Sequence, residues 1–266
     1  MDSQQPLDTA QLDHFRHEGY LVLPDFIDPG FNQRLKDEVD IMMAHRDAGD
    51  MRMVVSYREM GMLTSYPPAM AILAQLMDGD RFAMHHIHSV RFAAGAGGVG
   101  WHQDYEQHPH SNRSHLMVHI FCYLNGLNGE VGDLLVLPRS HNVIAERNLT
   151  FLGTADLEGS LCFDDLSPGS AVIVHSALWH ARRPKPGGEG RPRYFIDISY
   201  CQNGVKWPAY GNVEGINAMA LEMGLDRDGR YRFVYDSSQF YDLRALMDRF
   251  ERVNQGSLIN RLELPG

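Results

Sequence analysis

The middle of the chain is a series of short apolar or alternating runs separated by turn residues, and this pattern limits the possible folds more than any other feature. Five runs stand out, at residues 82–92, 116–124, 133–137, 170–174 and 194–200. Runs of this kind are typical of β-strands, and their spacing favours an antiparallel β-sandwich or barrel over βαβ units. We therefore expect a mainly β fold.

Helices are expected on either side of this β region. Three should begin near residues 9, 29 and 67, with a short strand at residues 20–23 between the first two. The clearest start signal is Asp28 followed by Pro29, an N-cap and a proline at the first helical position. Near the C-terminus, helical spacing of four apolar residues predicts another amphipathic helix: Phe240, Leu243, Met247 and Phe250.

Composition limits the class of protein. The 266 residues are 44% hydrophobic and 22% charged, which is typical of a globular chain, and there is no repeat or linker. We expect one domain, residues 1–266, with a helical or lid-like extension after about residue 202. The net charge of −10 argues against binding to nucleic acid or an anionic membrane.

Neither export nor membrane insertion is indicated. The N-terminus lacks a signal peptide pattern, and no apolar run approaches the roughly 20 residues that span a bilayer. The three cysteines form no C-x-x-C pair, so Cys122 and Cys201 are expected to be small buried apolar residues. We expect a cytoplasmic protein, either a monomer or a homodimer.

A histidine and an aspartate two residues apart, His102 and Asp104, are the first candidate metal ligands. In an extended segment, residues i and i+2 face the same side, so both side chains can reach one ion. A third ligand from a later strand would complete the 2-His-1-carboxylate set that suits non-haem Fe(II), and His175 and His180 are both candidates. A second H-x-D, at residues 45–47, falls in an expected helix, where i and i+2 diverge.

A glycine-rich segment at residues 95–100 matches G-x-G-x-x-G but is not expected to bind a dinucleotide. That function needs the loop to open a helix. Here the loop runs directly into the segment of His102, so it is interpreted as a β–β connection.

The order of these segments resembles the phytanoyl-CoA dioxygenase family of Fe(II)/2-oxoglutarate-dependent oxygenases. The resemblance runs from Phe15 to about Ser199 and includes Trp-His-Gln-Asp at residues 101–104 and the glycine-to-histidine stretch at 169–180. Residues 128–141 resemble the family's Asn-Gly…Leu-Pro-Gly-Ser-His, with arginine at position 139 where glycine is usual.

The resemblance implies a double-stranded β-helix core, the jelly-roll shared with cupins. It also puts the distal metal ligand at His180 and makes His175 a non-ligand. The implied Fe(II) ligands are therefore His102, Asp104 and His180. Because family halogenases lack the carboxylate ligand, the presence of Asp104 argues against halogenation.

The co-substrates implied by the resemblance are 2-oxoglutarate and O₂. Arg193 is the first choice for the residue that binds the distal carboxylate of 2-oxoglutarate, and Arg191 is the alternative because a glycine-rich insertion blurs the spacing. Arg182 replaces a serine that often helps to hold this co-substrate, so it either holds 2-oxoglutarate or faces the substrate. His119 is a further candidate, from a neighbouring strand.

Four residues are candidates for contact with the substrate. Tyr105 and His108 follow the metal segment in a polar loop that is equally consistent with plain solvation. His175 and Asp197 are the others, and Asp197 shares a strand face with Arg193. Since a buried carboxylate needs a partner, we expect Asp197 to pair with an arginine. The strand at residues 82–92 holds three histidines, of which we expect one to face the site and two to be structural: His85, His86 and His88.

The favoured function is an Fe(II)/2-oxoglutarate-dependent dioxygenase that hydroxylates or otherwise oxidises a C–H bond of a small or medium organic molecule, with release of succinate and CO₂. A natural product is the favoured substrate class. Two alternatives stay open: a metal-dependent cupin isomerase or epimerase without 2-oxoglutarate, and a non-catalytic β-barrel binding protein.

Overall fold

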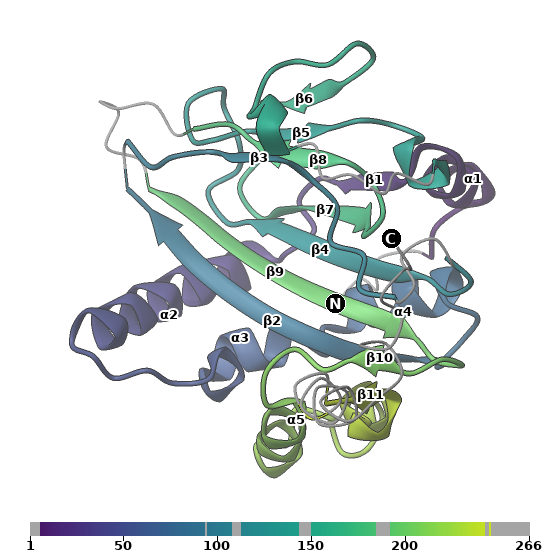
Figure 1. Cartoon of the computed structure of the whole chain (residues 1–266). Helices are drawn as coiled ribbons and strands as arrows, with labels where there is room; N and C mark the ends of the chain where they lie inside the picture. Colours follow the sequence, from purple (N-terminus) through teal and green to yellow (C-terminus); the bar gives the residue numbers. More distant parts are fainter. Residues whose placement is uncertain are drawn as a thin grey trace, which may run out of the picture.

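Two antiparallel sheets face each other in the computed structural model, which describes residues 6–93, 95–107, 113–143, 150–184, 192–242 and 245 (Figure 1). The larger sheet has the order β1-β7-β4-β9-β2 and the smaller has the order β3-β8-β5-β6. Strands of the larger sheet are β1 (Tyr20–Leu23), β2 (Phe82–Phe92), β4 (Met117–Tyr123), β7 (Ser170–His175) and β9 (Arg193–Gln202). Strands of the smaller sheet are β3 (Val99–His102), β5 (Leu134–Val136), β6 (Leu161–Phe163) and β8 (His180–Arg182).

Successive strands cross from one sheet to the other. From β2 to β9 the chain alternates between the larger and the smaller sheet, except that β5 and β6 are neighbours in the smaller one. This interleaving is the jelly-roll arrangement. The mainly β fold with flanking helices is thereby confirmed, and the glycine-rich segment does connect two strands, β2 and β3.

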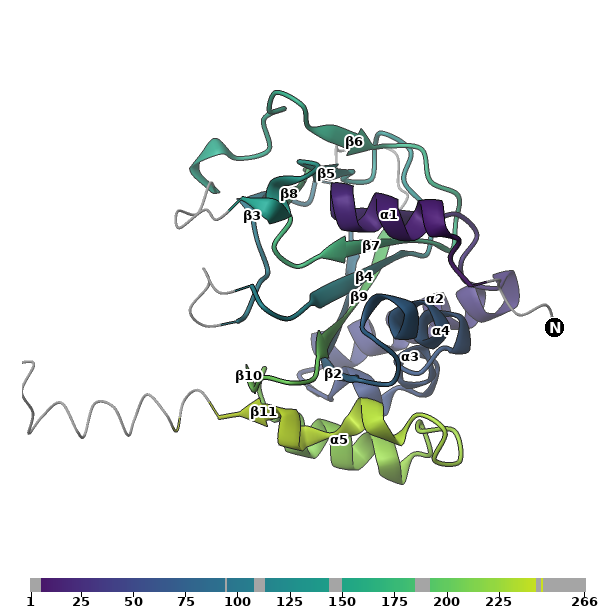
Figure 2. The same cartoon turned by 90° about the vertical axis from the view of Figure 1, so that its right-hand side faces the viewer.

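Three helices cover the outer face of the larger sheet: α2 (Pro29–Asp47), α3 (Arg58–Leu63) and α4 (Pro67–Leu76) (Figures 1 and 2). Helix α1 (Thr9–Glu18) precedes β1, and Asp8 caps it through a capping box with Gln11. Asp28 caps α2 as expected, and Pro29 is its first residue. Residue 47 is still within α2, so the H-x-D at 45–47 is helical.

Alternation along β4 and β9 separates the apolar core from the opposite face of the sheet. Ile120 and Cys122 of β4 and Ile198 of β9 pack in the cluster formed with the helices. The residues between them, such as His119 and Asp197, point the other way, into the space between the sheets. The outer face of the sheet is therefore hydrophobic, whereas the inner face carries the polar residues of the cavity together with apolar ones such as Phe121.

The C-terminal region differs from the expectation. Phe240 lies in a short strand, β11 (Phe240–Tyr241), which pairs with β10 (Trp207–Pro208), so the helix predicted to include it is wrong at that residue. The other three positions of that pattern lie outside the described residues. Among the described residues that follow β10, the structure has the helix α5 (Val213–Glu222), which sequence reasoning missed (Figure 2).

Short 3₁₀ turns complete the described chain: η1 (Val54–Ser56), η2 (Ser140–Asn142), η3 (Thr150–Leu152), η4 (Arg232–Tyr235) and η5 (Ser237–Gln239). Among the helices in the described ranges, none combines the length and apolar character needed to span a membrane.

Candidate functional site

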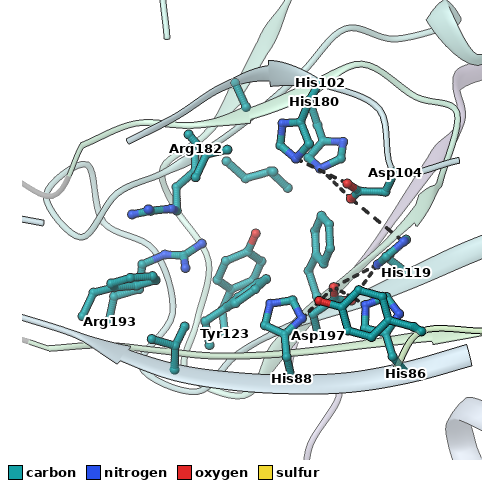
Figure 3. Close-up of a pocket in the computed structure, with 18 of the residues that line it drawn as sticks. His86, His88, His102, Asp104, His119, Tyr123, His180, Arg182, Arg193 and Asp197 are labelled. Carbon is teal, nitrogen blue, oxygen red and sulfur yellow. Dashed lines mark hydrogen bonds and ion pairs between the residues drawn. The ribbon is translucent and has the colours of Figure 1, made fainter. Parts of the chain in front are cut away.

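Two histidines meet because their strands pair. His102 ends β3 and His180 begins β8, and the two are direct Cα partners in the smaller sheet. Their ring centroids are 4.2 Å apart. Two residues after His102, the backbone N–H of Asp104 donates to the carbonyl of Ser176 (2.8 Å). The possible ligand atoms of His102, Asp104 and His180 all lie within 4.8 Å of one another (Figure 3).

The proton positions of this triad suit a cation. His102 Nδ1 donates to the Gly100 carbonyl (2.7 Å) and His180 Nδ1 donates to the Leu178 carbonyl (3.1 Å), so in each neutral ring Nε2 carries the lone pair. Burial lowers the pKa of His102, which favours its neutral form. The two Nε2 atoms lie 3.5 and 3.2 Å from the oxygens of Asp104. Three acceptors thus converge, and a divalent metal ion fits them.

The triad lines a cavity of about 290 Å³ between the two sheets. One end of the cavity is basic and aromatic, with Arg182, Arg193, Phe92 and Tyr123. The other end holds histidines, an acid and a tyrosine: His86, His88, His119, Asp197 and Tyr210. Figure 3 shows the metal-ligand candidates beside the cavity, with the arginines and the histidine cluster at opposite ends.

Two arginines at the basic end have no anionic partner within the described part of the chain. Arg193 is 2% exposed, and its guanidinium lies 4.5 Å from the ring centroid of Phe195. Arg182 lies 4.3 Å from the ring centroid of Phe92. Arg193 Nε and Nη1 and Arg182 Nη1 are buried without a hydrogen-bond partner, and neither side chain lies within 4.0 Å of a carboxylate of the described residues.

Burial lowers the pKa of Arg193 to about 10, so the side chain is still cationic at neutral pH. A buried cation without a counter-ion is strongly unfavourable. A bidentate carboxylate matches the planar fork of arginine and would supply the missing hydrogen bonds. The basic end of the cavity therefore has the chemistry of a carboxylate site.

Asp197 pairs with a histidine and not with an arginine as expected. His119 Nδ1 lies 2.9 Å from both oxygens of Asp197, and His119 Nε2 lies 3.9 Å from Asp104 Oδ2. The prediction of an ion pair with arginine failed because Arg193, although on the same face of β9, is four residues away from Asp197 along the strand. His119 consequently lies between Asp197 and the triad, at the end of the cavity remote from the arginines (Figure 3).

Four other candidate residues do not reach the cavity or lie outside the described part of the chain. Tyr105 is buried, and its hydroxyl donates to the His115 carbonyl (3.1 Å) and contacts Gln107. His175 packs between the rings of Phe15 and Tyr105, away from the lining. His108 and Arg191 lie outside the described residues.

Sequence reasoning missed several residues that line the cavity. Of the three histidines of β2, the structure brings two, His86 and His88, to the cavity and leaves His85 behind the lining, so the expectation of one inward residue is wrong. Strand alternation contained the signal, because residues 86 and 88 share a face. No strand pattern could indicate that Tyr210 lines the cavity, because this residue lies in the loop between β10 and α5.

Solved structures with this fold include 2-oxoglutarate enzymes. AviO1 from Streptomyces viridochromogenes Tue57 is 18% identical, with a TM-score of 0.60 over 78% of this chain and 100% of that one. HygX from Streptomyces hygroscopicus, solved with nickel and 2-oxoglutarate bound, is 16% identical, with a TM-score of 0.61 over 77% and 90%. SnoN, a non-haem α-ketoglutarate-dependent epimerase from nogalamycin biosynthesis, is 13% identical, with a TM-score of 0.60 over 78% and 85%.

These likenesses establish the fold. No curated protein sequence matches the chain. The sequence profile of phytanoyl-CoA dioxygenase (PhyH), however, matches residues 15–191, which include the three candidate ligands. The chain therefore belongs to the phytanoyl-CoA dioxygenase family.

Proposed function

We propose that this protein is an Fe(II)/2-oxoglutarate-dependent oxygenase that oxidises a C–H bond of a small or medium organic molecule. His102, Asp104 and His180 would hold Fe(II) through two Nε2 atoms and one carboxylate. Bound there, Fe(II) together with 2-oxoglutarate and O₂ would supply the oxidation, with succinate and CO₂ as by-products.

The residues of the chain prepare the cavity for these groups. The Gly100 and Leu178 carbonyls fix the tautomers of His102 and His180, which keeps both Nε2 atoms free of protons. Arg193 binds the distal carboxylate of 2-oxoglutarate, and Arg182 adds positive charge beside it. The aromatic rings around both guanidinium groups exclude water, so each charge-assisted hydrogen bond is strengthened.

The single observation that carries the proposal is the presence of both features in one cavity: three converging acceptors and, at one end, two arginines whose buried nitrogen atoms have no counter-ion among the described residues. A metal-dependent isomerase that uses no 2-oxoglutarate would need the triad but not the unpaired arginines. A binding protein without catalysis would need neither. HygX with 2-oxoglutarate and SnoN with Fe³⁺ and α-ketoglutarate support the same function.

Succinate formation tests the proposal. The purified protein is incubated with Fe(II), 2-oxoglutarate, O₂ and a panel of natural products, and products are followed by mass spectrometry. Gain of one oxygen atom indicates hydroxylation, loss of two hydrogens indicates desaturation or ring closure, and an unchanged mass with a new stereoisomer indicates epimerisation. Activity that persists without 2-oxoglutarate, or in His180→Ala, would overturn the proposal.

A further inference from the structure

An irregularity in β2 brings two adjacent histidines into the interior. Met84 pairs with Tyr200 and His86 with Ser199, so His85 is an extra residue in the ladder with β9. A β-bulge of this kind re-aims the side chains beside it. His85 and His86 are both buried, and their Nδ1 atoms are only 2.8 Å apart.

The hydrogen-bond partners of His85 determine which atoms carry protons. His85 Nε2 lies 2.8 Å from the carbonyl oxygen of Pro208, which can only accept, so His85 Nε2 donates. Burial lowers the pKa of His85 to about 4, so this ring is neutral at pH 7 and its Nδ1 is an acceptor. The neighbouring His86 Nδ1 must then donate to it.

His86 consequently presents an unprotonated nitrogen to the cavity. Burial lowers the pKa of His86 to about 3, so the ring is neutral and its single proton is on Nδ1, which also lies 2.8 Å from Ser199 Oγ. The ring is held by stacking on Tyr210, with centroids 4.3 Å apart and planes 27° apart. Its Nε2 therefore has a lone pair and a fixed direction.

That lone pair faces a second acceptor. His86 Nε2 lies 3.9 Å from Asp197 Oδ2. Burial raises the pKa of Asp197, but His119, His88 and His86 together lower it below its ordinary value, so the carboxyl is ionised. This oxygen already accepts from His119 Nδ1 (2.9 Å), and His88 Nδ1 lies 3.5 Å from it. Both residues line the cavity, His86 Nε2 has a free lone pair, and a carboxylate oxygen can accept a further hydrogen bond. A group that donates to both atoms would therefore be held from two sides.

We propose that His86 Nε2 and Asp197 Oδ2 together bind an O–H or N–H group of the organic substrate at the end of the cavity opposite the arginines. The inference rests on the proposed function and adds a substrate requirement to it. The substrate carries a hydroxyl or amino donor near the carbon that is oxidised.

The same cluster does not form a second metal site. Ligand atoms of His86, His119 and Asp197 do lie within 4.8 Å of one another. His119 Nδ1, however, is committed as a donor to Asp197, and its Nε2 faces Asp104. One histidine and one carboxylate are too few to hold an ion, so we expect one metal ion per chain.

Histidine ¹⁵N NMR of the protein loaded with Zn(II) and 2-oxoglutarate tests the tautomers. At pH 7, His86 is expected to carry its proton on Nδ1 and His85 on Nε2. In His85→Phe, the only remaining partner of His86 Nδ1 is the Ser199 hydroxyl, which can donate to it, so an Nε2–H form is expected to appear. Ser199→Ala is the matched control and should leave the wild-type tautomer unchanged. A proton on His86 Nε2 in the wild type, or two Zn(II) ions per chain, would overturn the inference.

Binding of small probes tests the ligand class. Propane-1,3-diol and propane-1,3-diamine should each shift the His86 Nε2 resonance to lower frequency, whereas 1,3-dimethoxypropane, which lacks a donor, should not. The stronger of the two active probes identifies hydroxyl or ammonium. His86→Phe keeps the stacking on Tyr210 and should weaken probe binding about tenfold or more.

An equal response to the ether, or no response to either donor, would overturn the inference. None of these readouts needs turnover. Failure to bind 2-oxoglutarate would therefore contradict the proposed function while the His86 tautomer stayed readable.

Discussion

His102 and His180 are direct cross-strand partners in the smaller sheet, with ring centroids 4.2 Å apart. The backbone pairing of β3 with β8 therefore brings together two of the three candidate metal ligands. Asp104, two residues beyond His102, adds the carboxylate. Removal of either histidine should affect metal binding without unfolding the sheet, because the ladder does not depend on the side chains.

His102→Ala should lose stoichiometric Fe(II), because two ligands are too few to hold the ion. Metal content after dialysis measures the effect. His45→Ala is the matched control: His45 belongs to the other H-x-D, in α2, where it contacts the Tyr57 hydroxyl (2.9 Å). Equal metal content in the two variants would contradict the assignment of His102 as a ligand.

Arg193→Gln should weaken 2-oxoglutarate binding about ten- to hundredfold, because a hydrogen bond to a charged group contributes about 1.5–3 kcal/mol. Calorimetry with Zn(II)-loaded protein measures the dissociation constant. Arg183→Gln is the control, since Arg183 already pairs with Asp156 at 2.6 Å and does not line the cavity. An unchanged affinity in Arg193→Gln would show that another residue, with Arg191 the first to test, binds the carboxylate.

Gly126 is required by the turn that follows β4. Its φ is +72°, and a Cβ there would lie 2.0 Å from the Leu166 carbonyl oxygen, which accepts from the Leu127 N–H. Gly126→Ala should therefore destabilise the fold by about 2 kcal/mol more than Gly129→Ala, because the Leu127–Leu166 bridge must open. Gly129 has a similar φ of +83° but open space around it. Urea unfolding of both variants makes the comparison, and equal losses would contradict it.

His175 should make stability depend on pH. Burial lowers its pKa to about 3, and its Nδ1 accepts from the Ala177 N–H (3.0 Å). An unfolded histidine has a pKa near 6.5, so the unfolded state takes up the proton first and the free energy of unfolding falls as pH drops below about 6.5.

Between pH 7.5 and pH 5, protonation of His175 in the unfolded state should lower the free energy of unfolding of the wild type by about 2 kcal/mol. The His175→Gln variant should not show this loss. Glutamine keeps an acceptor for the Ala177 N–H but does not titrate. Urea unfolding at the two pH values measures the difference. Parallel losses in both proteins would mean that His175 does not resist protonation.

Local signals predicted much of the fold. The run at residues 82–92 matches β2 residue for residue, and Asp28 with Pro29 marked the start of α2. The two H-x-D pairs were separated correctly, because one lies in a helix and the other leaves a strand. Whether a segment forms a strand or a helix depends largely on its own residues and their neighbours, so it can be predicted from a single sequence.

Long-range features were not predictable in the same way. The bulge at His85 and the contact of His119 with Asp197 depend on the register between distant strands. The six-residue α3 is too short for a periodic pattern to reveal it. Arg139 takes a φ of +67° where the family usually has glycine, and its side chain pairs with Glu18. The extent of the single domain and the role of the C-terminal extension stay predictions.

The central claim is that one cavity binds Fe(II) at His102, Asp104 and His180 and 2-oxoglutarate at Arg193 at the same time. Anaerobic titration of the protein with Fe(II) and then 2-oxoglutarate tests it most directly, because chelation of Fe(II) by a 2-oxo acid produces a charge-transfer band in the visible spectrum. We predict a band that saturates at one Fe(II) and one 2-oxoglutarate per chain, is lost in His180→Ala and needs more 2-oxoglutarate in Arg193→Gln. No band in the wild type, or an identical titration in all three proteins, would contradict the account.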